Sequence, residues 1–223
     1  MKDNSYIAER IKEISATLPV GVTLIAVSKY HTAEDIATAY GAGQRDFGES
    51  KAQDLKVKHQ QLPSDIRWHF IGHLQSNKIK YIAPFIHLIH SIDSLRLLQE
   101  VNRYGMKENR RIACLLQIHI ATEETKFGFT PLECIAMLEE GSWRNLQNVE
   151  IKGLMCMASN TDDREQIAAE FATVETLFKE IKERFFKNDE SFSVLSAGMS
   201  DDYPIAIEHG STHVRIGSGI FVE

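Results

Sequence analysis

Short apolar runs rich in β-branched residues alternate along this chain with longer segments in which apolar residues recur every three or four positions. The short runs predict strands buried on both faces, and the longer segments predict amphipathic helices. The run Thr23-Leu24-Ile25-Ala26-Val27-Ser28-Lys29 is typical of the first kind. Strands are expected over residues 23–29, 45–49, 67–72, 87–92, 112–120, 149–157, 192–197 and 213–217.

Helical patterns fill the intervals, and several begin at recognisable start signals. An opening helix presents one apolar face, made of Ile7, Ile11, Ile14 and Leu18. Asn4 is its expected N-cap, Thr32 is expected to cap the next helix with Asp35 in its first turn, and residues 130–133 combine a capping-box spacing with proline at the first helical position. The longest helix is predicted over residues 162–187, on a stripe of Ile167, Phe171, Val174, Phe178, Ile181 and Phe185.

This alternation of strand and helix predicts a parallel sheet with helices outside it. Eight predicted strands in 223 residues, against a typical barrel length of about 250 residues, favour a single (β/α)8 TIM barrel with few insertions. An open doubly wound sheet is the alternative, and it usually needs fewer strands. Residues 1–223 are expected to form one domain with an extra N-terminal helix. Because the chain stops soon after the eighth strand, neither an eighth helix nor a C-terminal β-domain is expected.

Composition narrows the classes of function. A net charge of −6 argues against nucleic-acid or anionic-membrane partners. The segment Met1–Tyr6 lacks an apolar signal region, and no uninterrupted apolar stretch is long enough to span a bilayer. Cys114, Cys134 and Cys156 lack metal-ligand spacing and are expected to be reduced thiols in the core. We therefore expect a cytoplasmic protein without a metal site.

Lys29 is the first candidate for chemistry. It ends the first predicted strand, on the face where (β/α)8 barrels carry their active sites. Burial would favour its neutral amine, and a neutral amine attacks carbonyl carbons. The alternative is a lysine that merely extends from the strand end into solvent.

Two glycine- and serine-containing segments follow the seventh and eighth predicted strands, where such barrels usually bind phosphate. They are Ser196–Ser200 and Arg215–Gly219. Small residues let backbone N–H groups approach a phosphate, and serine hydroxyls add donors. Two ordinary turns are the alternative. Asp201 and Asp202 weaken the phosphate interpretation, because their charges compete for the N-terminus of the next helix.

Arg215 could pair with a carboxylate such as Glu208 or Asp46, or it could face a ring nitrogen or phosphate of a ligand. A lysine for an aldehyde, a phosphate corner and an arginine across from them together describe pyridoxal 5′-phosphate (PLP). An arginine beside the pyridine nitrogen keeps that nitrogen unprotonated, which makes the cofactor a weaker electron sink. His69 is expected to line the pocket, and the other histidines are expected to be structural.

On these residues the chain resembles the pyridoxal phosphate homeostasis protein family, whose fold is similar to the N-terminal barrel of alanine racemase. The matching segments follow one another along nearly the whole chain and are 26–29, 47–49, 68–72, 74–78, 90–93, 126–128, 153–155, 195–202 and 214–218. Two positions depart from the family pattern, which usually has asparagine at Ser50 and proline at His73. A shorter donor at Ser50 could loosen a cofactor contact, and His73 could alter the pocket rim.

The resemblance implies that Lys29 holds PLP as a Schiff base. It implies that Ser196, Gly217 and Ser218 hold the phosphate and that Arg215 lies by the ring. Ser200, Ser50 and His69 are expected to complete the site. It further implies a role in PLP homeostasis, with no assigned catalytic residue. PLP-dependent apoenzymes are the expected recipients, and the protein is expected to be a monomer.

Two other functions stay open at this point. The first is a weak PLP-dependent amino-acid racemase or decarboxylase. Alanine racemase, however, adds a β-domain that supplies a catalytic tyrosine, and a chain ending at Glu223 leaves no room for it. Racemisation is therefore expected to be absent or very slow, with His69 as the only stand-in base and Tyr30 pointing away from Lys29. The second is an aldolase that forms a Schiff base with a phosphorylated sugar on the same lysine.

Overall fold

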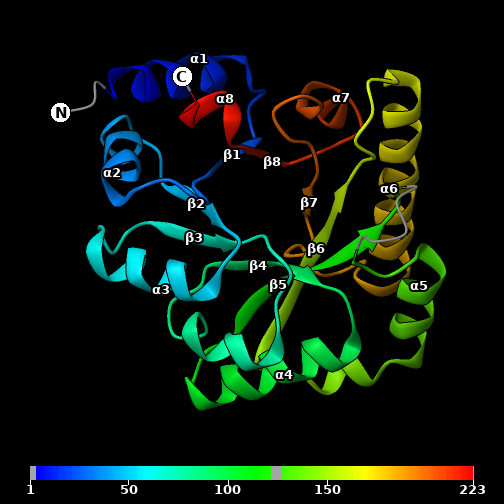
Figure 1. The fold of residues 1–223 in the computed structure, drawn as a ribbon. Coiled ribbons are helices and arrows are strands. Elements are labelled where there is room, and N and C mark those ends of the chain that lie inside the picture. The colour runs from blue at the N-terminus through cyan, green and yellow to red at the C-terminus, as the bar shows by residue number, and fades with distance from the viewer. Residues whose placement is uncertain (1–3, 122–126, 223) are drawn as a thin grey trace.

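The computed structural model describes residues 4–121 and 127–222 and shows a closed barrel of eight parallel strands (Figure 1). Each strand pairs with the next, and the last pairs with the first, which confirms the predicted (β/α)8 architecture. The strands are β1 (Thr23–Val27), β2 (Asp46–Glu49), β3 (Arg67–Phe70), β4 (Leu88–Ile92), β5 (Ile112–His119), β6 (Val149–Met157), β7 (Val194–Ser196) and β8 (His213–Ile216).

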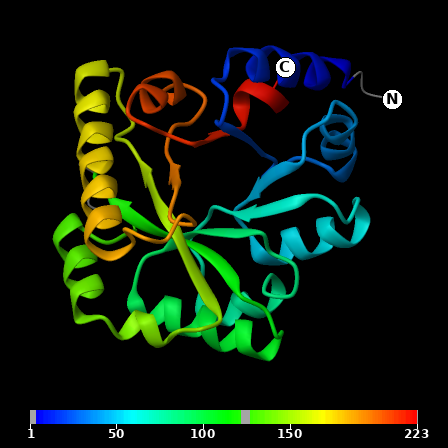
Figure 2. The same cartoon turned by 180° about the vertical axis from the view of Figure 1, so that it is seen from behind.

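Helices surround this barrel on the outside, as both views show (Figures 1 and 2). They are α1 (Ser5–Thr17), α2 (Ala33–Gly41), α3 (Ala52–Gln61), α4 (Leu95–Lys107), α5 (Pro131–Glu140), α6 (Arg164–Phe185), α7 (Tyr203–Glu208) and α8 (Ser218–Phe221), with 3-10 turns η1 (Ser76–Tyr81) and η2 (Ser142–Asn145). The expectation of no eighth helix is wrong, because the short α8 follows β8 and packs against α1. No helix in the described ranges is long and apolar enough to cross a bilayer.

Two of the three predicted helix caps form. Thr32 and Thr130 each accept a hydrogen bond from a first-turn backbone N–H within a capping box. Asn4 precedes α1 but makes no capping hydrogen bond. Its side-chain amide instead donates to Asp35 at 2.8 Å, because α2 brings that carboxylate within reach. Asn4 therefore ties α1 to α2 rather than starting its own helix.

The predicted strands are too long at several ends. β1 stops at Val27 rather than Lys29, and β7 covers residues 194–196 rather than 192–197. Phe192 is buried because its ring packs on Phe178 and Phe186, with centroids 5.0 and 4.4 Å away, and not because it belongs to a strand. Residues stay buried beyond the point where the backbone hydrogen bonds between strands end. The hydrophobic pattern therefore predicts strands that are too long.

The core divides into an outer and an inner part. The outer core lies between barrel and helices and includes the predicted stripe of α6 and all three cysteines, which are free and buried. The inner core is small and consists of Leu88, Leu115 and Met155. Branched aliphatic residues usually fill such a barrel. Here polar side chains occupy part of it, and they lead to the candidate site.

Candidate functional site

Lys29 lies in the loop after β1, two residues beyond the strand, and is exposed. The expectation that the protein buries this amine is wrong, since the strand ends before it. Its backbone is nevertheless held in place. The Ser28 hydroxyl donates to Glu49 at 2.6 Å, and the Lys58 ammonium donates to the Ser28 carbonyl at 2.9 Å and to Glu49 at 2.6 Å.

Tyr30 adopts a left-handed backbone conformation, with φ at 72°. A non-glycine residue in that region costs on the order of 1–3 kcal/mol, and such residues cluster at ligand sites. The Lys29 ammonium lies 6.0 Å from the centroid of the Tyr30 ring, so the expectation that Tyr30 points away from the lysine is wrong. Sequence reasoning missed this strained turn, because tyrosine carries no turn signal of its own.

A hydrogen bond between two serine hydroxyls joins the two segments of the predicted phosphate corner, which follow β7 and β8. Ser218 donates to the Ser200 hydroxyl at 2.9 Å, and the Gly219 N–H donates to the same oxygen at 3.4 Å. Gly198 allows the turn before Ser200, because its φ is +91° and an added Cβ would lie 2.7 Å from the Tyr203 Cα. The turns after β7 and β8 therefore meet, with two serine hydroxyls at their junction.

This corner is next to the strand that carries Lys29. β8 pairs with β1 so that Ala26 lies opposite Ile216. A Cβ added at Gly217 would lie 3.3 Å from the Cβ of Val27, so the turn after β8 packs closely against the end of β1. Lys29 and the serine corner therefore occupy adjacent positions at the carboxyl ends of the strands.

Ser196 does not belong to this corner. It is the last residue of β7, its side chain points into the barrel, and none of it is exposed. Its Oγ accepts a hydrogen bond from Arg215 at 2.6 Å and lies 3.0 Å from His90 Nδ1. The geometry gives no support to a phosphate contact by Ser196, because a residue within a strand faces the barrel interior rather than the loops above it.

Arg215 is a buried cation, 4% exposed, held by neutral groups. Nη1 donates to Ser196, and Nη2 donates to the Cys156 carbonyl at 2.8 Å. Within the described part of the chain it pairs with no carboxylate, so the partners Glu208 and Asp46 considered from the sequence do not hold it. Burial lowers its pKa. A buried charge without a counter-ion is costly, which suits a site where a ligand supplies an acceptor.

His69 lies inside the barrel rather than at a pocket wall, and it is 1% exposed. Its Nε2 is 3.0 Å from Asp46 Oδ1, and its Nδ1 is 2.9 Å from His90 Nε2. The expectation that His69 lines the cofactor pocket is therefore not supported, because β3 aims it toward Asp46 at the opposite ends of the strands. No group of His, Cys, Asp and Glu among the described residues converges as a metal site.

Ser50 follows β2, on the other side of Lys29 from the serine corner. It lines a cavity of about 230 Å³ together with Lys51, His73 and Lys78. His73 lies 3.3 Å from the Asp93 carboxylate and stacks on Phe127, with ring centroids 3.8 Å apart. His73 thus lies at the edge of this cavity, and its place at the cofactor pocket stays a prediction. Lys126, the other lysine of the matching segments, lies outside the described residues.

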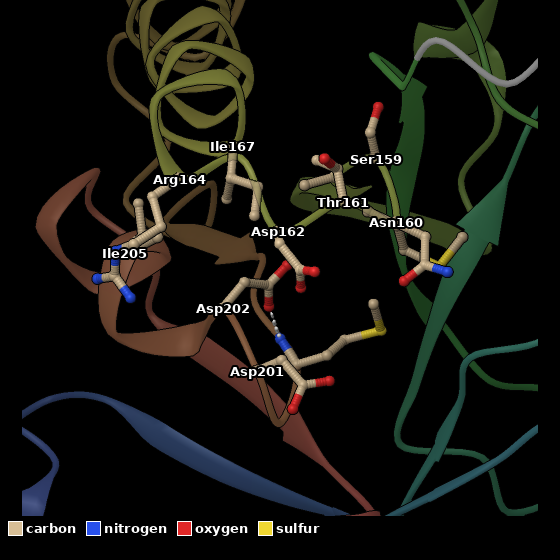
Figure 3. A pocket seen from close by; sticks show the side chains of 12 residues that line it. Ser159, Asn160, Thr161, Asp162, Arg164, Ile167, Asp201, Asp202 and Ile205 are labelled. Atoms are coloured by element: carbon tan, nitrogen blue, oxygen red, sulfur yellow. Dashed lines mark hydrogen bonds between the residues drawn. The ribbon is translucent and has the colours of Figure 1, made fainter.

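A larger cavity of about 420 Å³ lies between the start of α6 and the turn after β7 (Figure 3). The carboxyl groups of Asp162, Asp201 and Asp202 gather on one side of it, whereas the Arg164 guanidinium lies apart from them. Asp202 accepts the Met199 N–H at 2.5 Å and thereby holds that turn. The negative charge of the three aspartates would repel a phosphate from this cavity. The candidates for holding a cofactor therefore remain the residues around Lys29 and Arg215.

Comparison with known proteins shows the family of this chain. The alanine racemase N-terminal domain family matches residues 3–223. A pyridoxal phosphate homeostasis protein of Helicobacter pylori is 39% identical over 204 residues, covering 91% of this chain and 88% of that protein. One from Synechocystis is 38% identical, covering 94% of each. The chain belongs to the pyridoxal phosphate homeostasis protein family.

Solved structures place this family member among close structural neighbours. PipY of Synechococcus elongatus without PLP is 36% identical, with a TM-score of 0.90 over 96% of this chain and 99% of that one. The same protein with PLP bound has a TM-score of 0.87. Alanine racemase from Bartonella henselae is 15% identical, with a TM-score of 0.71 over 96% of this chain and 58% of that one. That last likeness concerns the fold alone.

Proposed function

We propose that this protein binds PLP and acts in PLP homeostasis. The carrying observation is Arg215, a buried guanidinium that pairs with no carboxylate of the described chain and lies one strand away from Lys29. A pyridine nitrogen is an acceptor that would engage such a cation without adding charge. The names of the relatives and the PLP bound to PipY support the same conclusion.

Each part of PLP has a candidate partner among these residues. In this proposal Lys29 is the residue that would hold the aldehyde carbon of PLP through a Schiff base. The hydroxyls of Ser200 and Ser218 and the backbone at Gly217 hold the phosphate, and Ser50 contacts the cofactor from the β2 side. Ser196 and His69 act behind Arg215 rather than on the cofactor. Bound PLP would supply an electrophilic carbon and a conjugated ring that accepts electrons.

A homeostatic role fits these residues better than turnover does. An unprotonated ring nitrogen beside Arg215 stabilises carbanions poorly. Stereoinversion also needs an acid and a base on opposite faces of the substrate carbon, and His69 is buried with both ring nitrogens engaged. We propose further that residues 1–223 act as one monomeric cytoplasmic unit and that PLP-dependent apoenzymes receive the cofactor.

Borohydride reduction tests this proposal directly. The protein is incubated with PLP, reduced, digested and examined by mass spectrometry. We expect one phosphopyridoxyl group, on the peptide that contains Lys29. A label on Lys126 alone would overturn the assignment of the lysine. Absence of any label or visible absorption band would overturn PLP binding and leave the aldolase alternative to be tested with phosphorylated sugars.

Amino-acid turnover by the PLP-loaded protein is expected to stay far below about 1 per second, the lower end for ordinary enzymes. The reason is that His69, the expected stand-in base, is buried with both ring nitrogens engaged, and that the cofactor ring beside Arg215 is a poor electron sink. Exchange of the α-hydrogen for deuterium and the chirality of alanine are followed by NMR and chiral chromatography. Turnover at or above that rate would contradict a homeostatic protein and favour a racemase. Loss of α-carboxylate would favour a decarboxylase.

Removing the serine corner should weaken PLP but not pyridoxal, which lacks the phosphate. For the double variant Ser200→Ala/Ser218→Ala we expect the PLP affinity to fall at least about tenfold, because hydrogen bonds to charged groups are lost. Ser196→Ala is the matched control, since Ser196 contacts Arg215 instead. It should weaken PLP and pyridoxal alike. Spectroscopic titration measures both ligands, and equal losses of both in the double variant would place the phosphate elsewhere.

A further inference from the structure

A continuous chain of hydrogen bonds crosses the barrel interior from Arg215 to Asp46. It runs from Arg215 Nη1 to Ser196 Oγ (2.6 Å), to His90 Nδ1 (3.0 Å), from His90 Nε2 to His69 Nδ1 (2.9 Å), and from His69 Nε2 to Asp46 Oδ1 (3.0 Å). The members come from β8, β7, β4, β3 and β2, and all five are buried. Side chains from five strands thus form one network.

The two ends of this chain determine its direction. Arg215 can only donate. Asp46 accepts, because the hydrogen bonds from His69 and Arg67 outweigh the effect of burial and hold the pKa of its carboxyl well below the usual range. With both histidines neutral, each group between these ends accepts from the Arg215 side and donates toward Asp46, and both rings carry their hydrogen on Nε2. In this arrangement no atom of the chain faces another donor or another acceptor.

Neighbouring groups leave this arrangement undisturbed near neutral pH. The His87 and His213 rings lie 5.3 and 6.4 Å from the His69 ring, centroid to centroid. Loss of hydration lowers the pKa of each to about 4, so both are uncharged. Burial also lowers the pKa of His90 well below its usual value. Arg67, on the far side of Asp46, is half exposed and in contact with solvent at the amino ends of the strands.

We propose that Asp46, His69 and His90 are positioning residues for Arg215. Through Ser196 they present an acceptor to Nη1 and orient the guanidinium so that its remaining donors face the ring nitrogen of PLP. Asp46, which also forms an ion pair with Arg67, ends the chain and polarises its hydrogen bonds toward the arginine. This inference rests on the proposed function, because it takes Arg215 as the group beside the ring. Recognition of the ring nitrogen would then depend on a carboxylate at the opposite end of the barrel.

The test compares PLP with its analogue in which carbon replaces the ring nitrogen. Wild-type protein should bind PLP about tenfold or more tightly than the analogue, the ratio expected for one hydrogen bond to a charged group. Asp46→Asn should reduce that ratio at least about threefold, since coupled members of one network interact. A loss of stability alone would weaken both ligands equally and leave the ratio unchanged.

Asp65→Asn is the matched control. It removes the same charge near the amino ends of the strands, from an exposed carboxylate that pairs with Arg45 at 3.0 Å and is not part of the chain. It should keep the wild-type ratio. His69→Phe is the second variant, because it keeps a ring of similar size and removes both hydrogen bonds. If Asp46→Asn and His69→Phe both fold and both keep the wild-type ratio, the positioning role is wrong.

Nitrogen-15 NMR of the protein without PLP gives an independent readout. We expect neutral His69 and His90 with the hydrogen on Nε2, and side-chain signals of Arg215 that shift in Asp46→Asn but not in Asp65→Asn. A charged His69 or His90, or a hydrogen on Nδ1 of either, would overturn the direction of the chain. Failure of wild-type protein to bind either ligand would instead refute the proposed function. The NMR result would still test the direction of the hydrogen bonds between Arg215 and Asp46.

Discussion

Lys29→Ala is expected to abolish the covalent attachment of PLP while leaving the barrel folded. The lysine is exposed in a loop, so its removal takes no volume from the core. Changes at such positions usually alter stability by about 0.5 kcal/mol or less. The aldehyde carbon, by contrast, loses the amine with which it forms a bond. Borohydride reduction followed by mass spectrometry measures the loss, and thermal unfolding measures the stability.

Lys51→Ala is the matched control for this experiment. Lys51 is also exposed, and its ammonium lies 5.5 Å from the centroid of the Tyr30 ring. It should keep the full label. If Lys29→Ala keeps the full label and Lys51→Ala loses it, the bond-forming amine is Lys51. If both keep it, neither lysine is the attachment point and the assignment to Lys29 is wrong.

Acidification is expected to destabilise the protein strongly between about pH 6.5 and pH 4. Burial lowers the pKa of His213 from 6.5 to about 4 and lowers that of His90 well below its usual value. In this pH range these histidines bind protons in the unfolded chain but stay neutral in the folded chain. The free energy of unfolding therefore decreases as the pH falls. At about 1.4 kcal/mol per pKa unit, His213 alone removes about 3 kcal/mol. A typical domain has about 5–15 kcal/mol in total.

Denaturant unfolding at pH 7.5 and at pH 4.5 checks this prediction. Wild-type protein should lose several kcal/mol between the two, and His213→Leu should lose less, because its contribution to proton uptake is gone. An identical pH dependence in wild type and His213→Leu would show that His213 is protonated in the folded protein. Asp46 affects the pH dependence of stability only at lower pH, because its lowered pKa keeps the carboxyl of the folded protein ionised throughout this range.

Local patterns were sufficient to predict the barrel and one corner of the candidate site. Apolar periodicity identified every strand, the capping spacings at Thr32 and Thr130 marked two helix starts, and small residues after the last two strands predicted a corner where Ser200 and Ser218 do meet. These features depend on residues near one another in the chain. Hydrogen bonding within a few positions and a repeated burial pattern determine them, so the sequence carries them directly.

Only the tertiary structure decided what the polar residues inside the barrel contact. Trp68, His69 and Phe70 are all buried, so alternation along β3 cannot tell which of them points into the barrel. His90 and Ser196 are 106 positions apart and meet because the closed barrel brings β4 and β7 across one interior. For the same reason Arg215 reaches Ser196 rather than a carboxylate, and His69 reaches Asp46 rather than a pocket. Such pairings depend on barrel closure and register, which no short stretch of sequence encodes.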